Sequence, residues 1–121
     1  MLGWKVMGSG MPGLTITAVC SDTATALSAA GTTQGTATEL TAADSEITTV
    51  GSGSGVVLSS KLAPGDEQTV YNAGANPLKV YPPSGMKINS LAANASMTLA
   101  TNTACFYKCL STTRVMAVLS A

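Results

Sequence analysis

Turn-forming residues interrupt the second half of the chain at intervals of roughly 8–12 positions, and short runs of alternating apolar residues lie between them. The strongest breaks are residues 63–66, 73–76 and 82–85, which carry proline, glycine, asparagine or aspartate. Short strands at this spacing are typical of sandwiches and barrels. We therefore expect an all-β protein, a β-sandwich or a small, jelly-roll-like barrel, with an extended N-terminal arm.

The clearest pair of expected strands covers residues 68–72 and 78–81. The second is expected to return as the hairpin partner of the first, with Leu78 and Val80 on one face. A pair of prolines at 82–83 follows directly. Because proline has no N–H to donate to a ladder, we expect this corner to lie at a sheet edge.

Further short strands are expected over residues 86–89 and 96–100, and two longer ones close the chain. The strand over 104–110 places apolar residues on both faces, so it requires burial on each side, within the domain or at a subunit contact. Its two alternating sets are Cys105, Tyr107 and Cys109 on one face and Phe106, Lys108 and Leu110 on the other. The strand over 113–120 is expected to turn Val115, Ala117 and Leu119 inward.

The first half of the chain carries a weaker pattern. Residues 14–19 are β-branched and alternating, which predicts a strand, and 36–40 and 45–50 predict two short ones. Residues 22–36 fit a poor helix or a long loop, and 51–55 a flexible hinge or loop tip. We expect one β domain over 14–121, best defined over 56–121.

Residues 1–13 are expected to form the arm. Glycines and a proline interrupt any regular element there, while apolar residues alternate along it. An exposed apolar arm binds a partner by strand addition or by filling a pocket. The candidate partner-binding residues are Leu2, Trp4, Val6, Met7 and Met11. The alternatives are that the arm folds back on its own domain, or that translation begins at Met11.

Charge limits the possible functions. Six Lys and Arg balance six Asp and Glu in 121 residues, and no histidine occurs. Without a concentrated basic patch, we expect neither a nucleic-acid nor a membrane partner. Without histidine, the commonest proton-transfer and nucleophilic chemistries are missing. We therefore expect a structural or interaction protein, not an enzyme, with no cofactor.

The remaining reactive residues favour structural roles. Cys20, Cys105 and Cys109 are an odd count without metal-site spacing, so we expect buried free thiols in a reducing cytoplasm. Asp66 and its neighbour Glu67 point to opposite faces of a strand, which favours solvation of a turn. The remaining acidic pair, at positions 44 and 46, shares a face but lacks the ligand-rich loop of a calcium site, so we expect no metal.

The stretch GDEQTVYNAGANPLKVYPPSG at residues 65–85, with its phrase G-D-x-Q-x-V-x-N-x-G, resembles small β-rich virion proteins of tailed bacteriophages. The resemblance covers roughly residues 56–121. Among such proteins, the capsid decoration or cement proteins fit this length best. The resemblance implies a homotrimer that clamps neighbouring subunits of the major capsid protein.

On this resemblance, the protein is made in the host cytoplasm and resides on the capsid exterior of the virion. The alternative is a tail-associated structural protein or a protein that binds host-surface glycans. Such a protein is expected to hold a sugar through Tyr71, Tyr81 and Tyr107.

Overall fold

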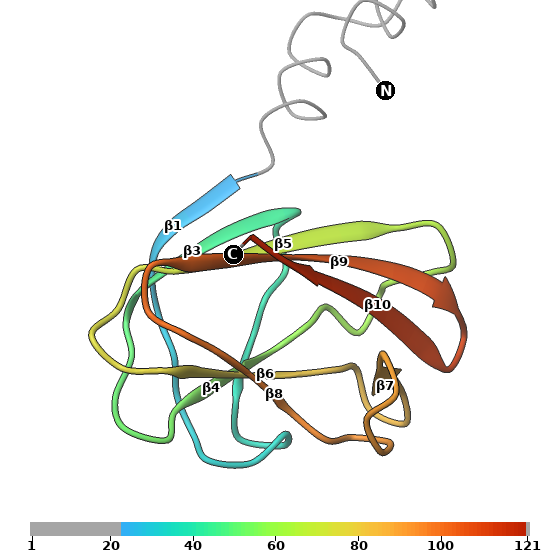
Figure 1. The fold of residues 1–121 in the computed structure, drawn as a ribbon, viewed down its shortest axis with the longest axis horizontal. Helices are drawn as coiled ribbons and strands as arrows, with labels where there is room; N and C mark the ends of the chain where they lie inside the picture. Colours follow the sequence, from blue (N-terminus) through green and yellow to red (C-terminus); the bar gives the residue numbers. More distant parts are fainter. Residues whose placement is uncertain (1–22, 121) are drawn as a thin grey trace, which may run out of the picture.

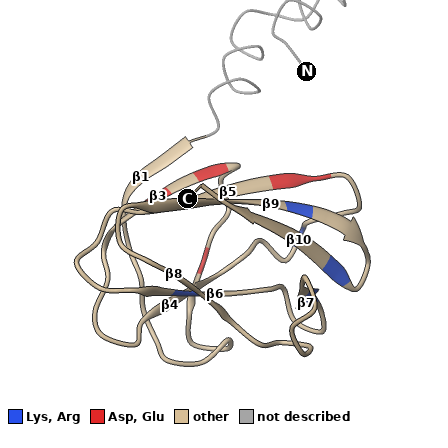
Figure 2. Cartoon of the chain, in the orientation of Figure 1, with Lys and Arg blue, Asp and Glu red and all other residues tan. Residues whose placement is uncertain are grey.

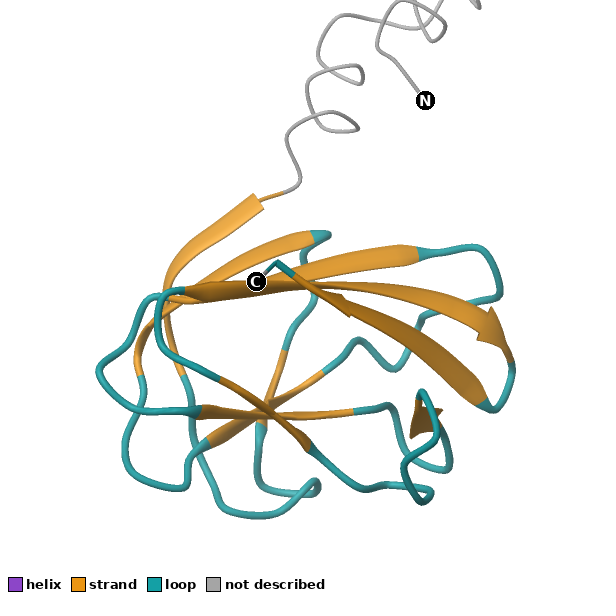
Figure 3. Ribbon diagram, in the orientation of Figure 1, coloured by secondary structure: helices purple, strands orange, loops and turns teal. Residues whose placement is uncertain are grey.

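A computed structural model describes residues 23–120. This part of the chain is all-β and contains no helix (Figure 3). The expected arm over 1–13, with its candidate residues Leu2, Trp4, Val6, Met7 and Met11, and the expected strand over 14–19 lie outside the described residues. The strands are β1 Thr23–Ser28, β2 Thr38–Glu39, β3 Asp44–Thr49, β4 Gly55–Val57, β5 Glu67–Asn72, β6 Leu78–Tyr81, β7 Lys87–Ile88, β8 Met97–Leu99, β9 Thr103–Ser111 and β10 Arg114–Leu119.

The first six strands alternate between two sheets (Figure 1). The odd-numbered strands β1, β3 and β5 lie side by side in a six-stranded sheet, and β2, β4 and β6 lie side by side in a four-stranded sheet. All four pairings among these strands are parallel. Each turn of the chain therefore lays one strand on each sheet, and the strands form a β-solenoid-like stacked coil.

The last strands make both sheets mixed. β8 closes the four-stranded sheet antiparallel to β6, and β9 joins the six-stranded sheet antiparallel to β5. β10 pairs with β9 as an antiparallel hairpin, and the short β7 adds a parallel edge at Arg114 and Val115. The strand orders are β1-β3-β5-β9-β10-β7 and β2-β4-β6-β8.

The expected sandwich or barrel is therefore wrong. The hairpin between residues 68–72 and 78–81 is also wrong, because β5 and β6 belong to different sheets. A turn between two short strands has the same sequence signature whether the chain pairs back on itself or crosses to the opposite sheet. The alternation of apolar residues locates each strand and its inward face, but it does not identify the pairing partner.

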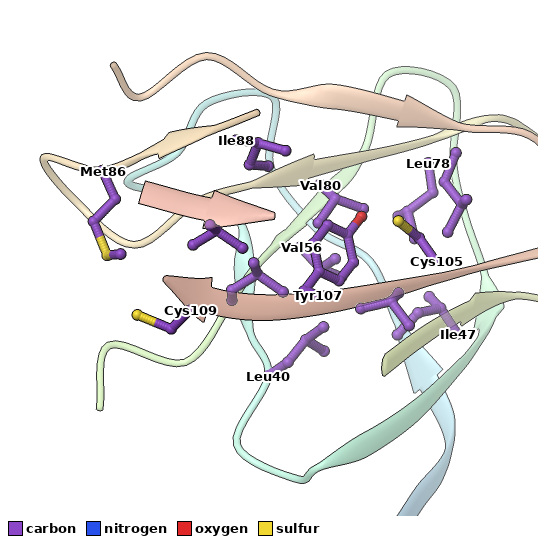
Figure 4. Close-up of a cluster of buried hydrophobic side chains, with 14 of the residues drawn as sticks. Leu40, Ile47, Val56, Leu78, Val80, Met86, Ile88, Cys105, Tyr107 and Cys109 are labelled. Carbon is purple, nitrogen blue, oxygen red and sulfur yellow. The ribbon is translucent and has the colours of Figure 1, made fainter. Parts of the chain in front are cut away.

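The core fills the space inside the coil (Figure 4). Stacking of successive turns carries apolar residues over one another, as where Val56 of β4 pairs with Val80 of β6. Leu78 and Val80 lie on one buried face as expected. The other fully buried members include Leu40, Ile47, Leu58, Val70, Ile88, Leu99, Cys105, Tyr107, Cys109 and Val115.

Three local expectations need correction. β1 occupies part of residues 22–36, where a poor helix or a loop was expected. The 82–83 proline pair does not mark a sheet edge, since β6 lies between β4 and β8 and both prolines are buried. The prolines are tolerated there because β6 ends before them and neither has to donate to a ladder. Leu119 is 52 % exposed instead of buried, since β7 pairs only beside the start of β10 and leaves its end unflanked.

Candidate interaction surface

The outer face of the six-stranded sheet carries exposed apolar residues, among them Leu110 and Val118. On β9, Cys105, Tyr107 and Cys109 share one face, as the alternation predicted, and the structure shows that this face points inward and is buried. The opposite set points outward, and Leu110 in that set is exposed. Within residues 23–120 no segment packs over this face (Figure 1).

Cross-strand pairing gathers the outward apolar residues into one area. Phe106 lies between Thr69 of β5 and Val118 of β10. Val118 is 52 % exposed, and Met116 lies beside Lys108 in the next register position. We call this area the outer patch, and it consists of Tyr71, Phe106, Leu110, Met116 and Val118.

Charged residues of opposite sign lie beside the outer patch and within it (Figure 2). Asp44 and Glu46 lie on β3 and Glu67 on β5, while Lys108 and Arg114 lie on β9 and β10. One ion pair crosses the face, where Lys108 Nζ lies 3.9 Å from Glu67 Oε2. Because Lys108 stands between Phe106 and Leu110 on β9, the outer patch mixes apolar and charged groups, as many protein–protein interfaces do.

The fixed positions of the phrase G-D-x-Q-x-V-x-N-x-G serve the turn and the packing of the coil, and none of them belongs to the outer patch. Gln68, Val70 and Asn72 are the three inward, buried positions of β5. The Gln68 amide donates to the carbonyls of Leu40 and Ala42 and accepts from the Ser59 N–H. A buried amide with all its partners in place ties the start of β5 to the preceding turn.

Asn72 fixes the other end of β5 through hydrogen bonds of its own buried amide. Its amide donates to the carbonyls of Leu99 and Asn76 and accepts from the Gly74 N–H. A Cβ at position 74 would lie 2.5 Å from Val50 Cγ2, so this close approach requires glycine. The phrase is thus a signature of packing, and sequence reasoning missed these two buried amides as structural centres.

Asp66 and Gly65 form the turn that precedes β5. Gly65 has a φ of +95°, and Asp66 Oδ2 accepts a hydrogen bond of 2.9 Å from the Ala63 N–H. The expectation that Asp66 serves a turn is confirmed. The acidic residues at 44 and 46 share the outer face as expected, and no group of three potential metal ligands occurs among residues 23–120.

A shallow depression of about 260 Å³ lies beside this turn, lined by residues from 41–43, 59–62 and 66–68. Three of the polar side chains in its lining have partners within the protein. The Gln68 amide makes the hydrogen bonds given above, Asp66 accepts a hydrogen bond from the Ala63 N–H, and Glu67 forms an ion pair with Lys108.

The three tyrosines do not share a surface. Tyr107 is fully buried, and its hydroxyl lies 3.3 Å from Met97 Sδ. Burial raises the pKa of Tyr107 far above its ordinary value, because the phenolate would lose its hydration. Tyr81 is also buried and donates to the Thr32 carbonyl at 3.0 Å. Of the three, only Tyr71 contributes to the outer patch.

The described cysteines are inert core residues. Cys105 and Cys109 are free and buried, as expected, and burial raises the pKa of both thiols by disfavouring the thiolate. Cys109 Sγ donates to the Ser111 carbonyl at 3.1 Å. Cys20 lies outside the described residues.

No described helix is long and apolar enough to cross a membrane. Comparisons with known proteins identify no relative: no family model, no curated protein and no solved structure matches the chain. Among the described residues, the outer patch is therefore the structural feature that bears on function.

Proposed function

We propose that the protein is a non-enzymatic structural component of a bacteriophage virion, a decoration protein that binds the major capsid protein on the exterior of the shell. The observation that carries the proposal is the outer patch, an apolar area on a sheet face that no other described segment covers. The resemblance of residues 65–85 to phage virion proteins supplies the class of partner.

The chemistry of the outer patch suits a contact repeated many times. Fully burying a side chain such as Phe106 or Val118 contributes roughly 1.5–3 kcal/mol. The loss of translational and rotational freedom on association offsets much of the summed gain, so one copy of this surface binds only modestly. A capsid presents many identical sites, and an oligomer that engages several of them multiplies modest contacts through avidity. A homotrimer is the assembly proposed for this purpose.

The flanking charges give the contact an orientation. The acidic residues Asp44 and Glu46 lie on one side of the outer patch and Arg114 on the other (Figure 2). Charges at a rim steer association and suppress wrong orientations more than they add affinity. A shell surface with the opposite order of charge is the expected partner.

Co-sedimentation with undecorated shells of the same phage tests the proposal. We expect saturation at a fixed ratio to capsid subunits. Val118→Asp should weaken binding by about tenfold or more, because an unpaired carboxylate in an apolar contact costs more than ~1.4 kcal/mol. The matched control is Thr98→Asp, at an exposed position of β8 in the other sheet, which should bind normally.

Two results would contradict the proposal. One is no sedimentation of wild-type protein with shells, which would move attention to the tail or to a host-surface ligand. The other is equal binding by V118D and T98D, which would show that the shell contact lies away from the outer patch.

A further inference from the structure

Two opposite charges lie side by side in the middle of the outer face of the six-stranded sheet. Glu67 of β5 pairs in register with Lys108 of β9, and their side chains are 55 % and 41 % exposed. β5 and β9 are the central pair of strands in this sheet. Since Lys108 Nζ lies 3.9 Å from Glu67 Oε2, beyond the ~2.7–2.9 Å of a close charge-assisted hydrogen bond, both groups can bind a partner from outside the chain.

The line between β5 and β9 divides the outer face into an acidic half and a basic half (Figure 2). β3 and β5 carry carboxylates and no lysine or arginine, whereas β9 and β10 carry basic residues and no aspartate or glutamate. The carboxylates belong to Asp44, Glu46 and Glu67, and the basic residues are Lys108 and Arg114. A second copy of the same face, turned by half a rotation, therefore presents the complementary order of charge.

A two-fold axis along that line places the outer faces of two copies against each other. Each β5 then covers the β9 of the other copy, and each β3 covers the other β10. Glu67 of each copy faces Lys108 of the other, so the four charges alternate in sign. A contact of this kind is isologous, because it uses the same surface on both copies. Charges of opposite sign fix the relative position of the two faces and disfavour other arrangements.

The side chains beside these charges fit under the same rotation. Phe106 of β9 pairs in register with Thr69 of β5. Tyr71 of β5 pairs in the same way with Ala104 of β9. The rotation therefore sets each aromatic ring of one copy over the smaller side chain of the same pair in the other copy. Large side chains over small ones allow two sheet faces to interdigitate.

The overall charge of the chain permits the association. Six Lys and Arg balance six Asp and Glu, so two copies carry no net charge that would hold them apart. Attraction between the faces acts at short range, because salt at physiological concentration screens exposed charges beyond ~8 Å. Pairing should therefore be strongest at low salt.

The area of the contact limits the strength of the pairing. Neighbouring strands lie ~4.8 Å apart and rise ~3.3 Å per residue, so β3, β5, β9 and β10 together cover about 400 Å². A stable, specific interface buries ~800 Å² on each partner. Two copies therefore associate only at high concentration, and the outer patch is free in dilute protein.

We propose that two copies of this chain pair through their outer patches about this axis, as a weak dimer of the free protein. The pairing regulates the shell contact, and this consequence alone rests on the proposed function. A second copy and the shell occupy the same face, so each excludes the other. The shell offers many sites to one assembly and therefore displaces the dimer through avidity. A trimer on the shell is then joined through another surface.

Charge reversal across the axis tests the proposal without shells. Glu67→Lys and Lys108→Glu should each weaken the dimer by about tenfold or more, because like charges then face each other twice in every pair. An equimolar mixture of the two variants should dimerise as wild type does, since each introduced charge faces its opposite in the other variant. The double variant E67K/K108E should dimerise by itself for the same reason. Sedimentation equilibrium at low salt, over a range of protein concentrations, measures each association.

The matched controls are Glu39→Lys and Lys79→Glu, which make the same changes of charge on β2 and β6 of the four-stranded sheet and should dimerise like wild type. Urea denaturation verifies that each variant is folded. Wild-type protein that stays monomeric at every concentration, or an assembly that neither reversal affects, overturns the proposal. Failure of the mixture to recover the dimer also overturns it, because the two faces would not meet about this axis. A dimer that forms as expected in a protein that does not bind shells would overturn only the proposed function.

Discussion

The outer faces of the two sheets differ in what covers them. Over the four-stranded sheet, the crossing between β1 and β2 lies against β6: the Thr32 carbonyl accepts from the Tyr81 hydroxyl, and Gln34 Nε2 donates to the Pro82 carbonyl at 2.7 Å. Over the six-stranded sheet, Phe106 and Val118 have no such cover among the described residues.

The difference follows from the length of the connections. Residues 29–37 join β1 to β2 and are long enough to pass over an aromatic side chain. β9 and β10 are joined by residues 112–113 alone, which form a tight turn and cannot reach back over the sheet. An apolar face next to a short hairpin stays available for another molecule.

The largest effect is expected from comparing the two faces of β9 itself. Tyr107→Ala should lower the free energy of unfolding by about 3–5 kcal/mol, because it empties a fully buried aromatic site. Phe106→Ala, one residue away on the outer patch, should cost much less than this. Urea denaturation of both variants measures the difference. A loss of unfolding free energy at position 106 equal to that at 107 would mean that the outer face is packed within the monomer. The two faces of β9 would then not differ in burial.

A smaller effect is expected where the four-stranded sheet is covered. Tyr81→Phe removes the hydroxyl that binds the Thr32 carbonyl, so it should cost about 1 kcal/mol. Hydrogen exchange should also speed up across residues 31–37. Tyr71→Phe is the control, because its hydroxyl has no hydrogen-bond partner among the described residues. Unchanged exchange in Y81F would show that the hydrogen bond does not hold this cover in place.

Sequence patterns predicted the faces of strands well. Alternation over 104–110 grouped Cys105, Tyr107 and Cys109 on one face, and the same rule grouped Leu78 with Val80; the structure buries both groups. Period-2 alternation is a local property of one strand, so it survives whichever partner that strand takes. The outward positions Met116 and Val118 follow from the same alternation, although only their inward neighbours were singled out.

The alternation of apolar residues did not predict which strands pair with one another. The connection between β5 and β6, residues 73–77, has a length that fits a hairpin and equally fits a crossing to the opposite sheet. Contacts between distant residues decide whether the chain forms a hairpin or crosses to the opposite sheet. The side-chain amides of Gln68 and Asn72 donate to carbonyls of other turns, and Gly74 leaves room for the Val50 side chain. Successive turns share no sequence motif, so no internal repeat revealed the coil.

A still smaller effect is expected from acid on the margin of the four-stranded sheet. Hydrogen bonds from the Ser60 N–H and hydroxyl lower the pKa of Glu39 below its ordinary value. A lowered folded-state pKa stabilises the protein above the unfolded-state pKa, and the contribution disappears as the pH falls through the folded-state pKa. Glu39→Gln should therefore flatten the acid side of the stability profile slightly, measured by urea denaturation at several pH values. Glu46→Gln is the charge-matched control, and an identical change in both variants would count against the Ser60 contacts.

The smallest effect is expected at the ion pair that crosses the outer face. Lys108 Nζ and Glu67 Oε2 are 3.9 Å apart, and their side chains are 41 % and 55 % exposed. A pair this open to water contributes about 0–1 kcal/mol and is screened by salt. A double-mutant cycle with Glu67→Gln and Lys108→Met should give a coupling energy in the lower half of that range at low salt and near zero at high salt. A coupling energy clearly above that range, insensitive to salt, would mean that water is already excluded from this face in the free protein. The outer patch would then be covered as the opposite face is, and it would be no candidate for a shell contact.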